Sequence, residues 1–361
     1  MMFDEKLISA DSHVDEPLEL WQERLPAHLR HKAPHIEVRD GKRLMVQDGM
    51  RPKKMTLGYD EKTDEDRLRE QGRVQGWDVE YRLNAQDIDG VGAEVVYPGT
   101  FGLEMACSPD PEFQGMVSRV YNDWAMELFG GRRDRFAMAA LIPVVDIPWT
   151  CGEMRRVAGL GMGSFFLPSV VDPPYNRPEY KPIWETVEET GVPLNFHISS
   201  GRDPRVERGP GGAVINYIMG ALVDGIELLV YLCSSGVLMD HPNMDFVIVE
   251  SGAGWLAWEL HAMDEAYRKH HMYTRPKLDM LPSEYFKRQG YVTFGDDPVA
   301  LTTLGYYGPD RLLWGNDYPH HEGTWPHSRE VVETQFAGIG EDAKRKIVRE
   351  NAAGLYGFGV N

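Results

Sequence analysis

Short apolar runs alternate along the chain with segments in which apolar residues recur at the spacing of an amphipathic helix. The runs predict strands, because turn residues bound them and β-branched and aromatic residues are frequent in them. They cover residues 6–13, 93–99, 135–143, 163–169, 192–199, 244–252, 290–297 and 311–320. The helical pattern covers residues 112–129, 149–158, 178–190, 214–232, 255–270 and 299–304.

Strands that are apolar on both faces and alternate with helices predict a parallel sheet covered by helices. Eight such units favour a closed (β/α)₈ TIM barrel over an open sheet. We therefore expect residues 1–361 to form a single α/β barrel domain. The polar region 18–81 interrupts the pattern, and we interpret it as an insertion after the first strand that caps the barrel mouth.

Composition limits the partners that this barrel can have. Hydrophobic residues make up 42% and charged residues 26% of the chain, as in ordinary globular enzymes. The formal net charge of −18, with Lys and Arg scattered among acids, argues against nucleic acid and anionic membranes. We see neither a secretory signal nor an apolar run of the roughly 20 residues that span a bilayer. A cytoplasmic enzyme with a small-molecule substrate is the expectation.

Charged side chains and imidazoles collect where the predicted strands end. The stretch "ISADSHVDEP" places Asp11 and His13 two residues apart, on one face of the first strand. Three later strands end at His197, Glu250 and Asp317. Active sites of TIM barrels form at the carboxyl ends of the strands, so we expect these side chains to meet there. Charges at the ends of apolar strands are costly unless they are paired or bind a metal.

Two imidazoles with several carboxylates suit one or two divalent metal ions, with zinc, manganese and iron as the alternatives. The carboxylates of Asp11, Glu250 and Asp317 carry three negative charges, so one divalent ion leaves the site at minus one. Either Glu250 transfers protons beside a single ion, or it helps to bind a second one. We take Glu250 and Asp317 as the catalytic candidates.

Four residues on the loops after the fifth and eighth strands are candidates for substrate binding. They are Arg202, Arg205, His320 and His321. The arginines suit a substrate carboxylate or phosphate. Glu16, in the loop after the first strand, is predicted to orient His13 or His197 from behind the metal ligands. The alternative for Glu16 is a carboxylate at the entry of a helix.

The motifs "DSHVDEP", "NFHIS", "HPNMDFVIVESGAG" and "LLWGNDYPH" resemble the amidohydrolase superfamily, specifically the branch related to aminocarboxymuconate-semialdehyde decarboxylase. The resemblance covers nearly the whole chain. It implies metal ligation by Asp11, His13, His197 and Asp317, and it implies a homodimer. Two positions depart from the family pattern: Asp11 replaces the first His of a common His-x-His motif, and Glu250 replaces a His that serves as acid or base.

A carboxylate delivers a proton to carbon less readily than an imidazolium does, unless its pKa is raised. We therefore expect a hydrolase, in which metal-activated water attacks a carboxyl-type carbon of an amide, ester, lactone or thioester and Glu250 manages protons. The enzymatic alternatives are non-oxidative decarboxylation of an aromatic or unsaturated acid, and hydration of an unsaturated acid. An inactive barrel that binds a ligand is the non-enzymatic alternative.

Overall fold

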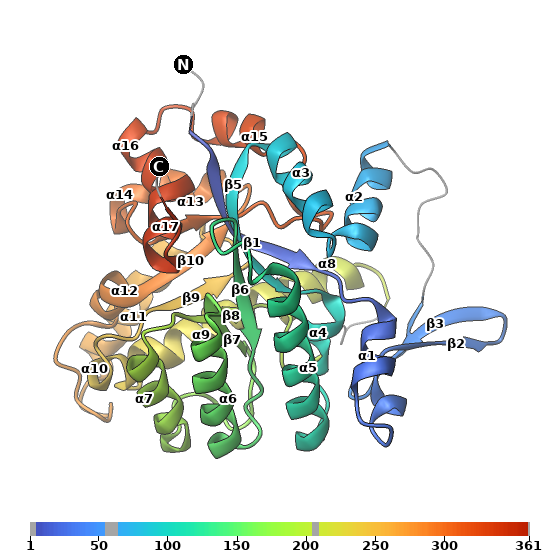
Figure 1. Cartoon of the computed structure of the whole chain (residues 1–361). Coiled ribbons are helices and arrows are strands. Elements are labelled where there is room, and N and C mark those ends of the chain that lie inside the picture. Colours follow the sequence, from blue (N-terminus) through green and yellow to red (C-terminus); the bar gives the residue numbers. More distant parts are fainter. Residues whose placement is uncertain (1–4, 55–63, 204–208, 360–361) are drawn as a thin grey trace.

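The computed structural model of the chain describes residues 5–54, 64–203 and 209–359, with the side chains of residues 64–66 left out. Its main sheet has eight strands, each parallel to its neighbours and arranged in chain order (Figure 1). These are β1 (Leu7–Val14), β5 (Val91–Pro98), β6 (Phe136–Leu141), β7 (Ser164–Pro168), β8 (Leu194–His197), β9 (Phe246–Val249), β10 (Gly290–Phe294) and β11 (Leu312–Trp314). All eight predicted strands are present, each within the residues predicted for it or at most two residues beyond.

The sheet closes on itself between β11 and β1. The backbone N–H of Asp317 donates to the Asp11 carbonyl at 2.9 Å, and that of His13 donates to the Tyr318 carbonyl at 2.6 Å. Ser12 and Tyr318 form a parallel bridge at the same place. The fold is therefore a (β/α)₈ TIM barrel, as the sequence pattern predicts.

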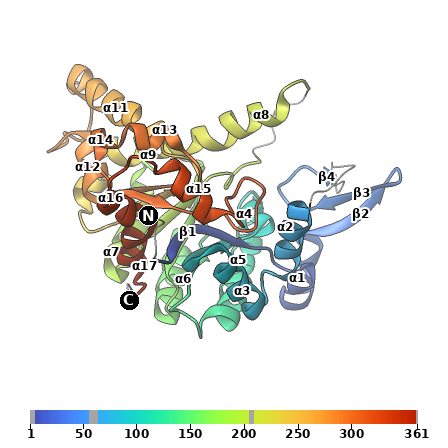
Figure 2. The ribbon, with the colours of Figure 1, turned by 90° about the horizontal axis from the view of Figure 1, so that it is seen from above.

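Helices surround the barrel on its outside (Figures 1 and 2). Those between and after the barrel strands are α4 (Thr100–Met105), α5 (Pro111–Phe129), α6 (Ile147–Leu160), η2 (Pro178–Tyr180), α7 (Lys181–Thr190), α8 (Gly212–Tyr217), η3 (Ile218–Leu222), α9 (Val223–Ser234), α10 (Val237–Asp240), α11 (Leu256–His270), α12 (Pro282–Gln289), α13 (Pro298–Thr302), α14 (Leu304–Tyr307), α15 (Ser328–Gln335), α16 (Glu341–Arg345), η4 (Lys346–Glu350) and α17 (Asn351–Tyr356). The predicted helices are present. The one predicted at 214–232 comprises α8, the π-helical turn η3 and α9.

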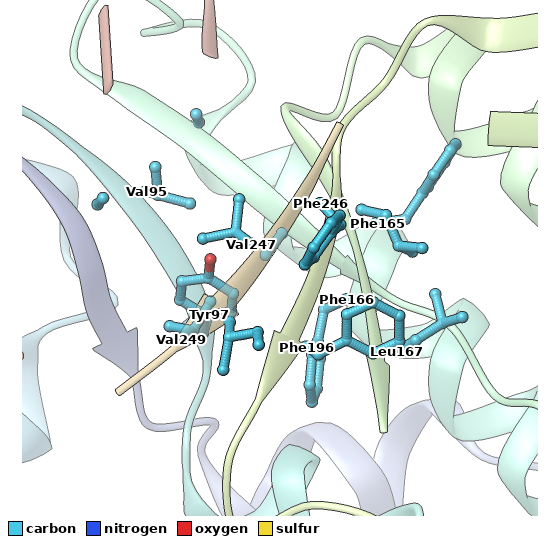
Figure 3. Packing of buried hydrophobic residues seen from close by; sticks show 14 of the residues in the cluster. Val95, Tyr97, Phe165, Phe166, Leu167, Phe196, Phe246, Val247 and Val249 are labelled. Carbon is cyan, nitrogen blue, oxygen red and sulfur yellow. The ribbon is translucent and has the colours of Figure 1, made fainter. Parts of the chain in front are cut away.

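Strands of the barrel bury side chains on both faces, which explains why they read as continuous apolar runs. Figure 3 shows part of this core, with side chains of β5, β7, β8 and β9 packed together. The rings of Tyr97 and Phe166 meet edge to face, with centroids 6.1 Å apart. Both rings also lie beside His197, with centroids 5.2 and 6.2 Å from it. Aromatic side chains of the core therefore pack against the ring of His197.

The region between β1 and β5 contains a small antiparallel sheet and several helices. The elements are α1 (Leu18–Arg24), η1 (Arg30–Lys32), β2 (His35–Arg39), β3 (Lys42–Val46), β4 (Lys53–Lys54), α2 (Asp64–Gln75) and α3 (Val79–Asp89). Strands β2 and β3 project away from the barrel (Figure 2). Helix α2 contacts the loops after β1 and β11: Arg73 Nε donates to Asp15 Oδ2 at 2.8 Å and Arg69 Nη2 donates to the Gly323 carbonyl at 3.2 Å. That this region caps the site stays a prediction.

The helical stretch Gly212–Ser234 is long and apolar enough to cross a membrane by length and composition, with a mean hydropathy of 1.7. By this measure the expectation that no apolar run reaches such a length is wrong, although Asp224 and Glu227 lie within the stretch and 33% of its most apolar window is buried. Leu228, Leu229 and Leu232 of its second half are buried in the barrel core. Core helices pass the same test, so the stretch by itself assigns no membrane partner.

Candidate metal centre

The five side chains predicted at strand ends meet at the carboxyl end of the barrel. Asp11 and His13 lie on β1, His197 is the last residue of β8, and Glu250 and Asp317 follow β9 and β11. The first three and Asp317 are buried, and the Glu250 side chain is 15% exposed. The parallel strands bring these residues together because all of their carboxyl ends lie at the same end of the barrel.

Nitrogen and oxygen atoms of these residues converge on a small volume. His13 Nε2 lies 3.1 Å from His197 Nε2, 3.4 Å from Asp317 Oδ1 and 3.6 Å from Asp11 Oδ1. His197 Nε2 lies 3.1 Å from Glu250 Oε2 and 3.6 Å from Asp11 Oδ1. Such separations are those of neighbouring ligand atoms that each lie roughly 2.1 Å from one ion.

The tautomers of the two histidines follow from their other ring nitrogens. His13 Nδ1 lies 2.8 Å from the Pro98 carbonyl, and His197 Nδ1 lies 2.9 Å from the Ile198 carbonyl. A carbonyl only accepts hydrogen bonds, so each Nδ1 carries a proton and each ring presents its Nε2 to the centre. Two lone pairs at 3.1 Å repel each other unless a cation or a proton lies between them.

The carboxylates also indicate that a cation binds in this centre. Asp11 Oδ1 and both side-chain oxygens of Asp317 are buried without a hydrogen-bond partner. Buried polar atoms without partners are costly and call for an explanation such as a bound ion. Ligand atoms of Asp11, His13 and His197 lie within 4.8 Å of one another, and so do those of His13, Glu250, Asp317 and His320. This mixed nitrogen and oxygen donor set fits a divalent cation.

Burial and neighbouring charges set the protonation of the two histidines differently. Burial lowers the pKa of His13 well below its ordinary value, and the neighbouring His320 and His197 rings add to this effect. Burial opposes the charged form of His197 as well, but the Asp11 and Glu250 carboxylates raise its pKa well above the ordinary value. His13 is therefore in the neutral form that binds metal, and His197 carries a proton that an ion would displace.

The pKa values of Asp317 and His320 are also shifted, and each residue affects the pKa of the other. Burial raises the pKa of Asp317 well above its ordinary value, although His320 opposes this. Burial lowers the pKa of His320, but the Asp317 carboxylate outweighs it and the pKa rises to about 9. The pKa of Glu250 is lowered overall, because His197 outweighs the effect of burial. A bound divalent cation would stabilise the ionised form of all these carboxyl groups.

Two residues of the centre have a backbone conformation that is unusual for side chains with a Cβ. Glu250 has a φ of 62° and Asp317 a φ of 49°, both in the left-handed region. The Glu250 N–H donates to Thr293 Oγ1 at 2.8 Å, and the Asp317 N–H donates to the Asp11 carbonyl at 2.9 Å. Strain held by such bonds is frequent at functional sites, where it aims a side chain away from the strand direction.

A pocket of about 420 Å³ opens beside the centre, and Asp11, Glu250 and Asp317 form part of its wall. Aromatic side chains form another part: Tyr217, Trp255 and Phe294. Its size and apolar walls suit a small organic molecule. Further acids also line it, namely Asp296, Asp297 and Glu322.

His320, predicted to contact substrate, lies within the centre itself. Its ring stacks on that of His13, with centroids 4.2 Å apart and an angle of 26° between the planes. Its Nδ1 lies 2.9 Å from Asp317 Oδ1, an ion-pair distance at an angle outside hydrogen-bond geometry. His320 is thus placed to exchange a proton with Asp317 after a small rotation.

The structure gives less information on the other predicted substrate residues. His321 is exposed on the loop after β11. Arg202 forms an ion pair with the buried Asp224 of α9, and its side chain is 44% exposed. Its part in substrate binding stays a prediction, as does that of His321. Arg205 lies outside the described residues.

Glu16 differs from its predicted role. The carbonyls of Pro98 and Ile198, rather than Glu16, accept from the Nδ1 atoms of His13 and His197. Glu16 Oε1 instead accepts from the Gly99 N–H at 3.2 Å, and Oε2 is buried without a partner. Pro98 ends β5 and Ile198 directly follows His197 at the end of β8, so backbone carbonyls take the place predicted for Glu16.

One functional feature escaped the sequence reasoning, a buried network behind Asp317. Asn316 Nδ2 donates to Asp89 Oδ2 at 3.0 Å, and Asn316 Oδ1 accepts from Ser9 Oγ at 2.9 Å. Asp89 Oδ1 also accepts from the Ser328 N–H at 2.9 Å. The network fixes the residue that precedes Asp317. The "GND" motif contained the signal for Asn316, whereas nothing local marked Asp89.

Comparison with known proteins identifies the family. The amidohydrolase family model matches residues 109–358, which is more than half of the chain. The chain therefore belongs to the amidohydrolase family, and the resemblance inferred from the strand-end motifs is confirmed. It is an enzyme family whose solved members include proteins with a bound divalent metal, manganese.

Gamma-resorcylate decarboxylase from Rhizobium sp. (strain MTP-10005) is 23% identical over 303 residues, 75% of this chain and 87% of the relative. Among solved structures, 5-carboxyvanillate decarboxylase from Sphingomonas paucimobilis has a TM-score of 0.72 at 23% identity, covering 98% of this chain and 99% of that one. Dihydroxybenzoic acid decarboxylase from Polaromonas sp. JS666, solved with manganese and an inhibitor, has a TM-score of 0.64 at 18% identity, covering 98% and 97%.

These relatives contradict the expected hydrolase. Three further curated relatives are also named gamma-resorcylate decarboxylase. The expectation gave too much weight to Glu250 as a carboxylate unable to protonate carbon. It overlooked the pairing of Asp317 with His320, which the structure places in the same centre.

Proposed function

We propose that the chain is a metal-dependent decarboxylase that removes CO₂ from a hydroxylated aromatic carboxylic acid without net oxidation. The named relatives support this reaction, and the aromatic walls of the pocket support a ring-shaped substrate. The observation that carries the proposal is the Asp317–His320 pair, whose nitrogen and oxygen lie 2.9 Å apart within the cluster of candidate metal ligands.

The residues that would hold the ion are Asp11, His13 and His197, with Glu250 as a further candidate and Asp317 while it is ionised. When bound, a divalent ion supplies positive charge that binds substrate oxygens and stabilises negative charge developing on them. Manganese in a structural neighbour supports testing this ion first, with zinc and iron as the alternatives.

Non-oxidative decarboxylation replaces CO₂ by a proton at the same carbon. In our proposal Asp317 donates the proton and a C–H bond forms at the ring carbon that bears the carboxylate. The bond from this carbon to the carboxylate then breaks, its electron pair restores the aromatic ring, and CO₂ leaves. His320 returns a proton to Asp317 across the 2.9 Å contact between Nδ1 and Oδ1. A positioned acid of this kind accelerates proton transfer by roughly 10²–10⁴-fold.

In the proposed reaction, the pocket walls position the aromatic ring of the substrate. Tyr217, Trp255 and Phe294 offer apolar surface beside the acids of the centre. Contacts of an aromatic ring with such side chains orient it and exclude water from the reacting carbon. Glu250 is the second candidate for proton transfer, because its Oε2 lies 3.1 Å from His197 Nε2.

The test is incubation of the manganese-loaded protein with gamma-resorcylate in D₂O, with CO₂ and the aromatic product quantified. We expect one CO₂ per product and one deuterium at the vacated carbon. Asp317→Asn should abolish both signals, whereas Glu250→Gln should retain the deuterium label at a reduced rate. Fully metal-loaded protein that releases no CO₂ from a panel of hydroxybenzoates would refute the proposal.

A further inference from the structure

Arg82 is a charged residue that lies completely buried behind the metal centre. It belongs to α3, and its side chain is 0% exposed. Its Nε donates to Glu94 Oε1 of β5, and Glu94 is also almost fully buried. An ion pair in this position requires both charges to leave water, which costs several kcal/mol per ion before the pairing offsets it.

The guanidinium group reaches the backbone of β1 at the residues that carry the candidate ligands. Arg82 Nη1 donates to the His13 carbonyl at 2.7 Å, and Nη2 donates to Ser12 Oγ at 2.9 Å. Ser12 Oγ in turn donates to the Val95 carbonyl at 2.8 Å. Ser12 lies between Asp11 and His13, so these bonds hold the segment of β1 from which both side chains project.

The same group also touches the loop that carries Asp317. Arg82 Cζ lies 5.1 Å from the centroid of the Tyr318 ring, within cation–π range. The Tyr318 carbonyl accepts from the His13 N–H at 2.6 Å. One planar side chain therefore contacts both chain segments that meet where the barrel closes.

Stability alone does not account for these contacts. Replacing a buried ion pair by apolar residues of similar size is often neutral or stabilising. What an apolar pair cannot reproduce is the planar fork of N–H groups, which binds the His13 carbonyl, the Ser12 hydroxyl and Glu94 at the same time. The arrangement is suited to specifying geometry.

We propose that Arg82 is a positioning residue of the metal centre, which holds the ends of β1 and β11 at the spacing that the ion requires. The proposal rests on the metal binding included in the proposed function. Partners located behind metal ligands affect metal affinity by roughly 10–100-fold. Loss of Arg82 should therefore weaken metal binding even where the barrel remains folded.

The experiment measures Mn²⁺ affinity by titration against a competing chelator, together with the electron paramagnetic resonance spectrum of bound Mn²⁺. The test variant is Arg82→Met combined with Glu94→Met, so that no unpaired charge stays buried. We expect a roughly 10–100-fold weaker affinity and an altered spectrum. Arg82→Lys, which keeps the charge and loses the fork, should lie between this variant and the wild type.

Arg349→Met is the matched control. Arg349 is also buried, and it pairs with Glu5 and the Lys6 carbonyl at the opposite end of β1. This variant should lower the unfolding temperature without changing Mn²⁺ affinity. If the Arg82 variants do not fold, Ser12→Ala is the test variant. It removes one hydrogen bond to the guanidinium group and should weaken Mn²⁺ affinity by about 3–10-fold.

Wild-type affinity and spectrum in either the folded double variant or, if that variant does not fold, Ser12→Ala would overturn the proposal. Wild-type protein that takes up no Mn²⁺ would overturn it as well. Wild-type protein that binds Mn²⁺ and decarboxylates nothing would refute the proposed function and leave the role of Arg82 supported by the affinity data.

Discussion

His13 Nε2 and His197 Nε2 lie 3.1 Å apart, and the Nδ1 atom of each ring faces a backbone carbonyl. The carbonyls hold a proton on each Nδ1, so the two Nε2 atoms face one another in the buried interior of the barrel and need a proton or a cation between them. The carboxylates around them have oxygens without hydrogen-bond partners. The centre is therefore arranged for a cation, and we expect the stability of the protein to depend on one.

Metal removal should destabilise the protein. We expect dialysis against a chelator to lower the unfolding free energy by about 3 kcal/mol relative to protein with free Mn²⁺ at a hundred times its dissociation constant. Differential scanning calorimetry with and without Mn²⁺ measures this. His197→Asn is the control, and its unfolding temperature should not respond to either treatment. If the unfolding temperature of the wild-type protein also did not respond to chelator, the metal assignment would be contradicted.

Asp317→Asn should separate catalysis from metal binding. The variant keeps the shape of the side chain and loses the proton, so decarboxylation should fall at least about 100-fold. Asp11, His13 and His197 remain, and elemental analysis should still find metal in the protein. Asp342→Asn, which changes a fully exposed acid of α16, serves as control and should keep most activity. Normal turnover in Asp317→Asn would exclude its role as proton donor.

Glu16 should make stability depend on pH. Burial raises its pKa to about 8 in the folded chain, against an ordinary value of 4.5. The folded state then binds a proton that the unfolded state has lost, so stability is highest below pH 4.5 and falls as the pH rises toward 8. Glu16→Gln removes the ionisable group, so its unfolding free energy should not fall with rising pH for this reason.

Between pH 5 and pH 7.5, we expect the unfolding free energy of Glu16→Gln to gain up to about 3 kcal/mol relative to the wild type. Urea unfolding at both pH values measures the difference. Glu19→Gln, a change at a side chain on the surface of α1, is the control and should show none. A difference that shrinks with rising pH would contradict the raised pKa.

The acids of the pocket should select substrates with a single carboxylate. Asp296 and Glu322 line the pocket, and none of its lining residues in the described part of the chain is Lys or Arg. A second carboxylate on the substrate would meet like charge there. We expect kcat/KM for gamma-resorcylate to exceed that for 5-carboxyvanillate by at least about tenfold. Glu322→Gln should narrow the ratio, and a preference for the dicarboxylate would refute this prediction.

The sequence predicted the barrel because each strand is buried on both faces, which leaves continuous apolar runs such as those around Phe166 and Val247. It located the cluster because a TIM barrel places all strand ends at the same end, so Asp11, His197 and Asp317 had to lie near one another. Both conclusions follow from short-range patterns and the topology that they imply.

The reaction type could not be predicted this way. In our proposal it depends on the contact of His320 with Asp317, and a loop residue three positions beyond Asp317 can turn either toward or away from it. Arg82 was missed for a similar reason. Its position within α3 gives no sign that its partners are Glu94, Ser12 and the His13 carbonyl.

The sequence by itself determined the eight-stranded barrel, the strand-end residues and the amidohydrolase resemblance, because hydrophobic periodicity and local motifs are properties of neighbouring residues. Only the tertiary structure decided the histidine tautomers, the left-handed backbone at Glu250 and Asp317, and the network behind β1. These depend on hydrogen bonds of about 3 Å between segments far apart in the chain, whose directions are set once the barrel has closed.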